Sequence, residues 1–310
     1  MQMREVLAEN LRALMGKNKN MIIIDADLSK ANGTYSLKKD FPGRVLNVGV
    51  AEQNMASIAA GMSSYGFVPF IFTFASFASR RMCDQIAISI CYSKQNVKIV
   101  GTDPGISAQI NGGTHMGLED IGILRNMPNM VIFEPTDEIQ LRKILPQIFS
   151  YNGPVYMRIF RKQAPIIFSQ NDNFSLFGSK KIKEGNDISI FCSGIMVDET
   201  LKANEDLKKL GISAEIINIY TIKPLDKEAV LNSVKKTNAA LAVENHNIIG
   251  GLKSSISEFL SENYPVLLRS VGIKDKFGQV GNLDCLKKVY EMKKENIVKT
   301  ALDLFKNKLK

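Results

Sequence analysis

The stretch NVGVAEQNMASIAAGMSSYG, at positions 47–66, contains the residue best placed to do chemistry. An apolar run ends at Val50, and Glu52 falls in the first turn of the helix that we expect next. A carboxylate there stabilises the helix dipole by about 0.3–1 kcal/mol, which is a purely structural role. A carboxyl group in a poorly solvated pocket can instead exchange a proton with a ligand. Position alone favours the structural role, so the choice depends on the neighbouring segments.

An aromatic pair follows in the stretch PFIFTFASFASRRMCDQI, at positions 69–86. Phe74 and Phe77 are three residues apart, so they share a face at the start of a helix. Core packing is the usual reason for such a pair. The alternative is a flat, ring-shaped ligand, which stacked or edge-on aromatic side chains bind well.

Polar residues also follow two other apolar runs. Asp27 ends MIIIDAD, and Asp103 comes directly after VKIVGT. Downstream, Asn111 and His115 belong to the glycine-rich stretch NGGTH. Ligands of open α/β sheets bind at the carboxyl ends of the strands, although Asp and Asn are equally common as turn caps.

These segments together resemble the transketolases and the related deoxyxylulose-phosphate synthases. Gly-Val-Ala-Glu-Gln-Asn-Met is similar to the family signature whose glutamate bonds N1′ of the aminopyrimidine ring of thiamine diphosphate. The resemblance implies that Glu52 is catalytic, and that Phe74 and Phe77 line the pyrimidine pocket. It places Asp27 near the thiazolium side of the cofactor. Arg80 matches a further pocket position that is often aromatic in the family.

The same resemblance assigns the substrate side of the site. The stretch TDPGISAQINGGTHMGLEDIGILRNMPNM makes His115 the match of a catalytic histidine that contacts the donor substrate. Asn111 and Asp103 stand where the family has an acidic residue and another histidine. Arg4 and Arg161 match two phosphate-binding arginines. Because a carboxylate at position 103 repels phosphate, we expect the acceptor to be a modified or nucleotide-linked sugar rather than an ordinary terminal sugar phosphate.

Short apolar runs alternate with helical patterns along the whole chain, which predicts parallel sheets covered by helices on both faces. The expected fold class is α/β, with two doubly wound domains. A pyrimidine-binding domain covers 1–165, a linker covers 166–185, and a transketolase C-terminal domain covers 186–310. Within the linker, FSLFGSKKIKEG is a candidate edge strand. The helices are predicted at 52–64, 76–92, 118–126, 137–150, 197–210, 226–236, 250–263 and 284–308.

The family's diphosphate-binding half has no counterpart in this sequence. The G-D-G motif that begins the metal site is absent, so no metal ligand is assigned to this chain. The resemblance therefore implies a partner, an N-terminal transketolase-like subunit that holds the diphosphate through Mg²⁺ or Ca²⁺. Two copies of each chain would form an α2β2 heterotetramer with its sites at subunit interfaces. The motifs INIYTIKPLD and LAVENHNIIGGL resemble the family's C-terminal domain, and we assign no chemistry to His246.

Three alternatives remain open at this point. One is half of a deoxyxylulose-phosphate synthase, which would decarboxylate pyruvate. A second is a subunit of an oxo-acid dehydrogenase, the beta chain, which the motifs GVAEQNM and THMGLEDIG disfavour. The third is a non-catalytic assembly subunit, which the altered residues at 31, 80, 103 and 111 keep open, whereas Glu52 and the aromatic pair argue against it.

Composition excludes several other classes of protein. The 310 residues carry a formal net charge of +9, but the lysines lack the tight, aromatic-interleaved clustering of a nucleic-acid footprint. Four cysteines without a C-x-x-C pair, and two histidines, do not make a recognised zinc site. We find neither a signal peptide nor an apolar run long enough to span a membrane, so the expectation is a cytoplasmic protein. Small sugar substrates are what the family resemblance implies.

Overall fold

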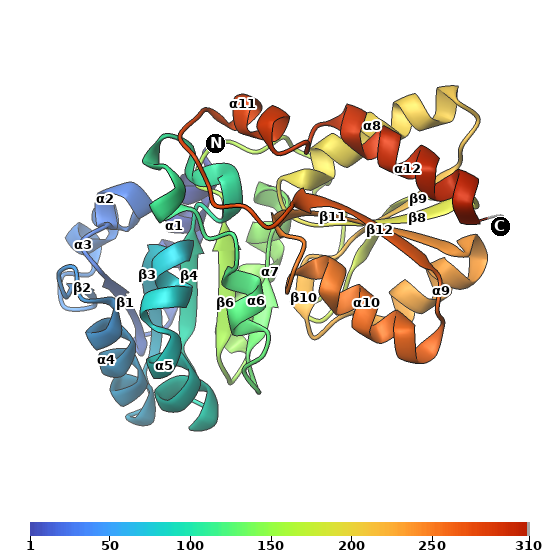
Figure 1. Ribbon diagram of the computed structural model, residues 1–310. Coiled ribbons are helices and arrows are strands. Elements are labelled where there is room, and N and C mark those ends of the chain that lie inside the picture. The colour runs from blue at the N-terminus through green and yellow to red at the C-terminus, as the bar shows by residue number, and fades with distance from the viewer. Residues whose placement is uncertain (309–310) are drawn as a thin grey trace.

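The computed structural model describes residues 1–308, which form two α/β units side by side (Figure 1). The first unit has a seven-stranded sheet in the order β10-β5-β6-β4-β3-β1-β2, parallel except for β10. Its strands are β1 (Met21–Asp25), β2 (Val45–Asn47), β3 (Val68–Phe74), β4 (Lys98–Thr102), β5 (Val131–Phe133), β6 (Val155–Ile159) and β10 (Thr221–Lys223).

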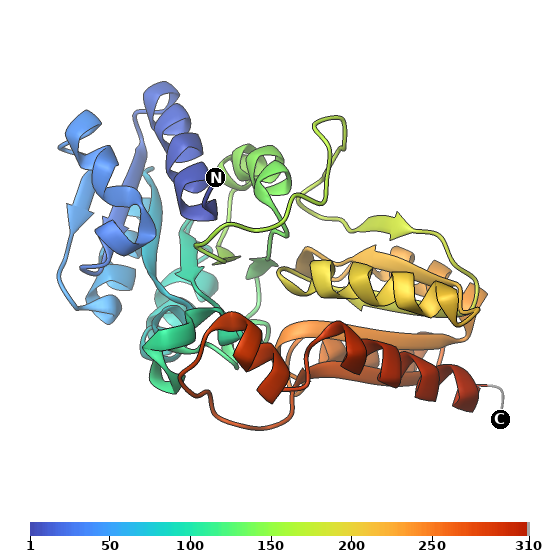
Figure 2. The same ribbon diagram turned by 90° about the horizontal axis from the view of Figure 1, so that it is seen from above.

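The second unit has a five-stranded sheet in the order β12-β11-β8-β9-β7, parallel except for β7 at one edge. Seen from above, α8 and α12 run along one face of this sheet (Figure 2). Its strands are β7 (Lys180–Lys183), β8 (Ile188–Cys192), β9 (Ala214–Asn218), β11 (Ala239–Asn247) and β12 (Leu267–Ile273). Its helices are α8 (Met196–Lys209), α9 (Lys227–Thr237), α10 (Leu252–Asn263), α11 (Leu283–Val289) and α12 (Lys294–Lys308).

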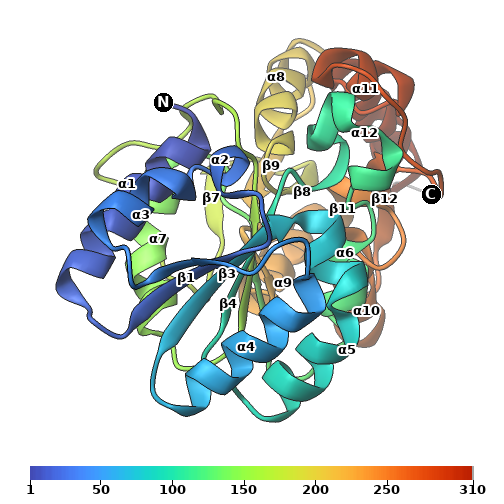
Figure 3. The ribbon, with the colours of Figure 1, turned by 90° about the vertical axis from the view of Figure 1, so that its left-hand side faces the viewer.

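Helices cover both faces of the first sheet (Figure 3). On one face lie α1 (Met3–Lys17) and α7 (Glu138–Ser150), whose apolar residues share a core with β1, β3 and β6. On the other face lie α4 (Glu52–Ser64), α6 (Asp120–Leu124) and the segment from Phe77 to Tyr92. All residues of β1 and β3 are buried, because a parallel sheet covered on both faces needs continuous apolar strands. The short elements of this unit are α2 (Ser29–Asn32), η1 (Thr34–Ser36), α3 (Leu37–Asp40), η4 (Gly105–Asn111) and η5 (Gly113–His115).

The predicted α/β class with its two helix-covered sheets is confirmed, and the structure corrects details. The predicted helix 284–308 is wrong, because two helices replace it. Glu291 adopts a left-handed φ of 55°, and the amide of Met292 donates to the carbonyl of Lys287 at 2.7 Å. This pattern is a Schellman motif, which ends α11 before α12 begins.

The predicted helix 76–92 and the predicted linker also differ in detail from the structure. The predicted helix 76–92 is interrupted by wide turns, η2 (Phe77–Arg81) and η3 (Ile86–Tyr92), on either side of α5 (Cys83–Gln85). The candidate edge strand is present as β7, antiparallel to β9. A feature that the sequence did not indicate is β10, which leaves the second unit to pair with β5 of the first.

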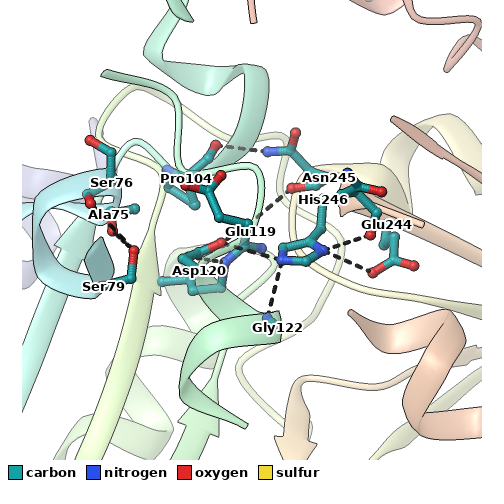
Figure 4. Close-up of polar contacts among 12 residues, drawn as sticks. Ala75, Ser76, Ser79, Pro104, Glu119, Asp120, Gly122, Glu244, Asn245 and His246 are labelled. Carbon is teal, nitrogen blue, oxygen red and sulfur yellow. Dashed lines mark hydrogen bonds and ion pairs between the residues drawn. The ribbon is translucent and has the colours of Figure 1, made fainter. Parts of the chain in front are cut away.

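A buried polar network joins the two units, and Figure 4 shows the part of it around Asp120, Asn245 and His246. Arg158 of β6 pairs with Asp120 of α6 at 2.7 Å and with Glu134 at 2.6 Å, and all three are buried. From the second unit, the carbonyl of Asn245 accepts from Arg158 at 3.0 Å. The ring of His246 accepts from the amide of Gly122 through Nε2 at 3.3 Å. Because this cluster holds β6 and α6 against β11, it also sets the positions of the loops that follow them.

Within residues 1–308, no helix is long and apolar enough to cross a membrane. Across the same range, no three His, Cys, Asp or Glu side chains are grouped so that they could hold a metal ion. The four cysteines are free thiols, of which Cys91 and Cys192 are buried and Cys285 is exposed.

Candidate active site

The residues singled out in the sequence meet at one edge of the first sheet. Strands β1, β3, β4 and β6 are parallel and adjacent, so the loops after them emerge at the same edge. These loops carry Asp27, Phe77, Asp103 and Arg161. The chain runs outward from β1 to β2 and then returns to place β3 on the other side of β1. Ligands of open α/β folds bind at such a switch point.

Glu52 is the first residue of α4, and 5% of it is exposed. Its Oε1 atom lies 2.9 Å from Nη1 of Arg81 and 3.5 Å from the hydroxyl of Thr73. The positive end of the helix dipole also favours a carboxylate at this position. Glu52 is therefore a nearly buried carboxylate with its functional end turned toward the neighbouring loops rather than toward solvent.

Three rings form a cluster beside this carboxylate. The centroids of Phe74 and Phe77 are 5.9 Å apart, and the ring of His115 lies 5.7 Å from the first and 5.2 Å from the second. All three contacts are edge-to-face, the arrangement that ring quadrupoles favour. Phe77 and His115 are only partly buried, so the cluster offers ring surface to a ligand.

Arg81 closes the gap between the carboxylate and the rings. Its guanidinium carbon lies 3.7 Å from the centroid of Phe77, while Nη1 bonds Glu52. Beside it is a pocket of about 400 Å³, lined by Val50, Ala51, Glu52, Gln53, Asn54, Arg80 and Arg81. The pocket places open space directly next to the buried carboxylate.

The candidate anion-binding residues are already partnered. Arg161 donates to Asp103 through Nε at 2.8 Å, and its guanidinium lies 4.8 Å from the ring centroid of Phe74. Asp103 is buried and also accepts from the backbone amide of Arg161 at 3.2 Å. The amide of Arg4 donates to the carbonyl of Arg161, which brings the two arginines together, and Nη1 of Arg4 donates to the carbonyl of Ala31. One carboxylate thus offsets one of the two guanidinium charges.

The remaining predicted residues lie on the rim. Arg80 pairs with Glu119 at 3.0 Å and donates to the carbonyl of Thr114 at 3.0 Å, so it is tied to the loop that carries His115. Asn111 is exposed. Asp27 is also exposed, and its Oδ1 accepts a hydrogen bond from the side-chain amide nitrogen Nδ2 of Asn47 at 2.9 Å.

Asp25, a buried neighbour of Asp27, was not singled out from the sequence. Asp25, the last residue of β1, has no exposed surface and accepts hydrogen bonds from the Leu28 amide, Asn32 and Thr34. Burial raises the pKa of Asp25 to about 6, against the lowering effect of those bonds. Its contacts fasten the loop after β1, so it supports the position of Asp27.

Backbone strain gathers at this edge. Asp27, Asp103 and Gln109 all have left-handed φ values, of 61°, 50° and 53°. Residues with a Cβ rarely adopt this conformation, and such residues collect at functional sites. Two of the three were singled out from sequence for other reasons.

Arg81 is the site residue that sequence reasoning missed. A signal was present, because Arg81 follows Phe77 by four residues and such pairs share a helix face. Two consecutive arginines in a helical segment otherwise look like a solvated surface. Which of them turns toward Glu52 depends on the wide turns of η2, which the sequence did not predict.

Family models of known proteins match both units of the chain. Residues 1–166 match the model of the transketolase pyrimidine-binding domain, and residues 178–297 match that of the transketolase C-terminal domain. The chain belongs to the transketolase family. The predicted fold class and the resemblance to the pyrimidine-binding and C-terminal domains of transketolases are thereby confirmed.

Several relatives are transketolase subunits of similar length. The 6-deoxy-6-sulfo-D-fructose transketolase subunit SqwH of Clostridium sp. is 45% identical, over 99% of this chain and 95% of that protein. An apulose-4-phosphate transketolase subunit of Phocaeicola vulgatus is 33% identical, over 98% of this chain and 97% of the other. A solved structure described as a split gene transketolase, inactive beta4 tetramer, has a TM-score of 0.90 and 37% identity over 99% of both chains. This chain is therefore a transketolase-type transferase subunit of the split kind.

The site of this transketolase subunit fits one part of the family's cofactor, thiamine diphosphate. An aminopyrimidine ring needs a carboxyl group at its edge and apolar ring surface against its face. Glu52 and Phe77 provide both, the guanidinium of Arg81 lies between them, and a pocket adjoins Glu52. The two residues therefore fit the pyrimidine half of the cofactor.

Proposed function

We propose that this chain is the pyrimidine-binding subunit of a thiamine-diphosphate-dependent enzyme that transfers a two-carbon ketol unit from a ketose to an aldehyde or ketone. The observation that carries the proposal is Glu52, a nearly buried carboxylate beside the Phe74–Phe77–His115 rings at the switch point of the sheet. When bound, thiamine diphosphate supplies the carbon nucleophile that accepts the ketol unit.

The residues of this chain would bind and orient in the following way. Glu52 would hold a proton at the ring nitrogen of the pyrimidine, and Phe74 and Phe77 would contact the faces of the ring. His115, in van der Waals reach of both rings, presents its imidazole to the donor substrate. Asp27 lies on the rim toward the thiazolium side, and its loop is held by buried Asp25.

The rim of the pocket has a separate proposed role. Arg80 lines the outer part of the pyrimidine pocket, where it is tied to the His115 loop. Asn111 faces the substrate as an uncharged donor and acceptor. Both residues are accessible, which supports contact with a ligand.

A second subunit completes the proposed enzyme. It would be an N-terminal transketolase-like chain that binds the diphosphate through Mg²⁺ or Ca²⁺, in an α2β2 assembly. Relatives of similar length are named as subunits, which supports this arrangement.

For the substrate, we propose a ketose that ends in a singly charged anion, with a sulfonate as the leading candidate. Arg4 and Arg161 provide the positive charge, and Asp103 offsets part of it. A phosphate ester carries about 1.5 to 2 negative charges at neutral pH, so it needs more positive charge than a sulfonate does. The 45% identity with a sulfofructose transketolase subunit supports the same substrate class.

One other catalytic function has some support. Deoxyxylulose-phosphate synthases match this chain at 32% identity, but over 48% of their own length. Such an enzyme would release carbon dioxide from pyruvate, whereas ketol transfer releases none. The third possibility, a non-catalytic assembly subunit, predicts that Glu52 has no effect on turnover.

The test is reconstitution with the partner subunit that co-purifies with this chain. We expect ketol transfer that depends on thiamine diphosphate and a divalent metal. Glu52→Gln should lower kcat by about 10²–10⁴-fold, the usual contribution of a positioned proton-transfer group. Glu9→Gln is the matched control, because it changes a half-exposed carboxylate that pairs with Arg142 rather than with a residue of the site. Full activity in Glu52→Gln would refute the proposal, and pyruvate-dependent carbon dioxide release would favour the synthase.

A further inference from the structure

The guanidinium of Arg81 makes two contacts that a cofactor ring would also make. It stacks on Phe77, with 3.7 Å between its central carbon and the ring centroid. At the same time it donates to Oε1 of Glu52 at 2.9 Å. A guanidinium is planar, delocalised and rich in N–H donors, so it satisfies both an aromatic face and a carboxylate.

The chain itself holds Arg81 loosely. Its side chain is 46% exposed, and among residues 1–308 its sole hydrogen-bond acceptor is Glu52. The preceding arginine is a useful contrast, because Arg80 bonds Glu119 and the carbonyls of Ser76 and Thr114. Arg81 can therefore swing into solvent at the loss of two contacts, whereas Arg80 is tethered to three other positions.

We propose that Arg81 is a displaceable occupant of the pyrimidine site, which takes the place of the cofactor ring in the free subunit and must leave when the cofactor binds. This inference rests on the proposed function, since it assumes that Glu52 and Phe77 receive the aminopyrimidine. While Arg81 lies on Phe77 and donates to Glu52, its guanidinium fills the space between that ring face and the carboxylate, so an aminopyrimidine ring cannot enter there.

Arg81 in this position stabilises the subunit before it assembles with its partner. A nearly buried carboxylate without a partner is costly, and Arg81 supplies one until the partner subunit and the cofactor arrive. The consequence is competition. Only the fraction of molecules in which Arg81 has left the site can bind the ring, so the apparent dissociation constant of the cofactor rises by the reciprocal of that fraction.

The experiment compares Arg81→Met with wild type in the complex with the partner subunit. Isothermal titration with thiamine diphosphate and Mg²⁺ measures the dissociation constant. Methionine keeps a flexible apolar side chain but loses the charge and the donors. We expect the variant to bind the cofactor about three- to tenfold more tightly, given the usual strength of a half-exposed ion pair and a cation–π contact.

A second measurement concerns the stability of the free chain, which should fall in the variant although the affinity for the cofactor rises. Without cofactor, Arg81→Met should lower the melting temperature, because Glu52 loses its partner. In a Glu52→Gln background the same change should have little further effect. Arg269→Met is the matched control, since Arg269 is 41% exposed and pairs with Asp303 in the second unit. It should leave the affinity for the cofactor unchanged.

The outcomes separate the two proposals. Equal or weaker cofactor binding by Arg81→Met would overturn this inference, because it would make Arg81 a bystander or a cofactor ligand. Wild-type complex that binds no thiamine diphosphate would instead overturn the proposed function. Tighter binding in the complex together with lower stability of the free chain is the result that a merely structural arginine cannot produce.

Discussion

Replacing Arg158 by methionine removes the guanidinium at the centre of the network that joins the two units. Arg158 donates to Asp120 at 2.7 and 3.0 Å, to Glu134 at 2.6 Å and to the carbonyl of Asn245 at 3.0 Å. None of the Arg158 side chain is exposed. The change therefore leaves two buried carboxylates close together without the cation that they share.

The size of the effect follows from that burial. Breaking a buried ion pair by removing one partner destabilises a protein by about 3–5 kcal/mol, because the remaining charge is neither paired nor hydrated. A typical domain is stable by about 5–15 kcal/mol, so the loss is a large fraction of the total. Part of it should be recovered at lower pH. Burial and the charge of Asp120 already raise the pKa of Glu134, and protonation of Glu134 would remove one of the two charges.

The assay is urea unfolding followed by far-ultraviolet circular dichroism at pH 7.5 and pH 5. Arg125→Met is the matched control, because Arg125 also bridges the units through Glu258, whose side chain is 62% exposed. It should cost less than about 1 kcal/mol. If Arg158→Met stays within about 1 kcal/mol of wild type at pH 7.5, the argument from buried charge is wrong.

Three further predictions concern pH, specificity and turnover. Burial raises the pKa of Glu244 from 4.5 to about 7, so the folded chain binds this proton more tightly than the unfolded chain does. Stability should therefore fall by about 3 kcal/mol as pH rises from 4.5 to 7, and Glu244→Gln should remove this slope in urea titrations. Asp103→Asn should free the charge of Arg161 and raise kcat/KM for a phosphorylated donor relative to a sulfonated one by about threefold or more. His115→Asn should lower kcat/KM for the donor by about tenfold or more while leaving cofactor affinity near its wild-type value.

Each of these predictions has a result that would contradict it. An unchanged pH slope in Glu244→Gln would mean that other groups titrate in that range. A falling phosphate-to-sulfonate ratio in Asp103→Asn would show that the carboxylate orients Arg161 rather than selecting charge. Loss of cofactor binding in His115→Asn would mean that the imidazole helps to hold the cofactor ring and makes no separate contact with the donor substrate.

Local patterns in the sequence were sufficient for much of the fold. Continuous apolar runs marked the parallel strands, and β1, β3 and β8 are buried throughout. The helix predicted at 52–64 has the bounds of α4. These features depend on the residues within one element, since a buried strand or a small-residue helix has the same composition wherever it packs. Glu52 and the Phe74–Phe77 pair were singled out through the family resemblance of their motifs, since position alone favoured a structural role for each.

Tertiary structure alone decided which side chains meet. The pairing of Asp103 with Arg161 joins residues 58 positions apart, and Arg158 reaches the carbonyl of Asn245, 87 positions away. Similarly, β10 crosses to the first sheet, and Arg81 rather than Arg80 turns toward Glu52. No local periodicity encodes such contacts, because they depend on how strands are ordered, how wide turns rotate a segment and which charges burial forces together. For this protein, the sequence by itself determined most of the elements and the family, whereas the electrostatic character of the site required the folded chain.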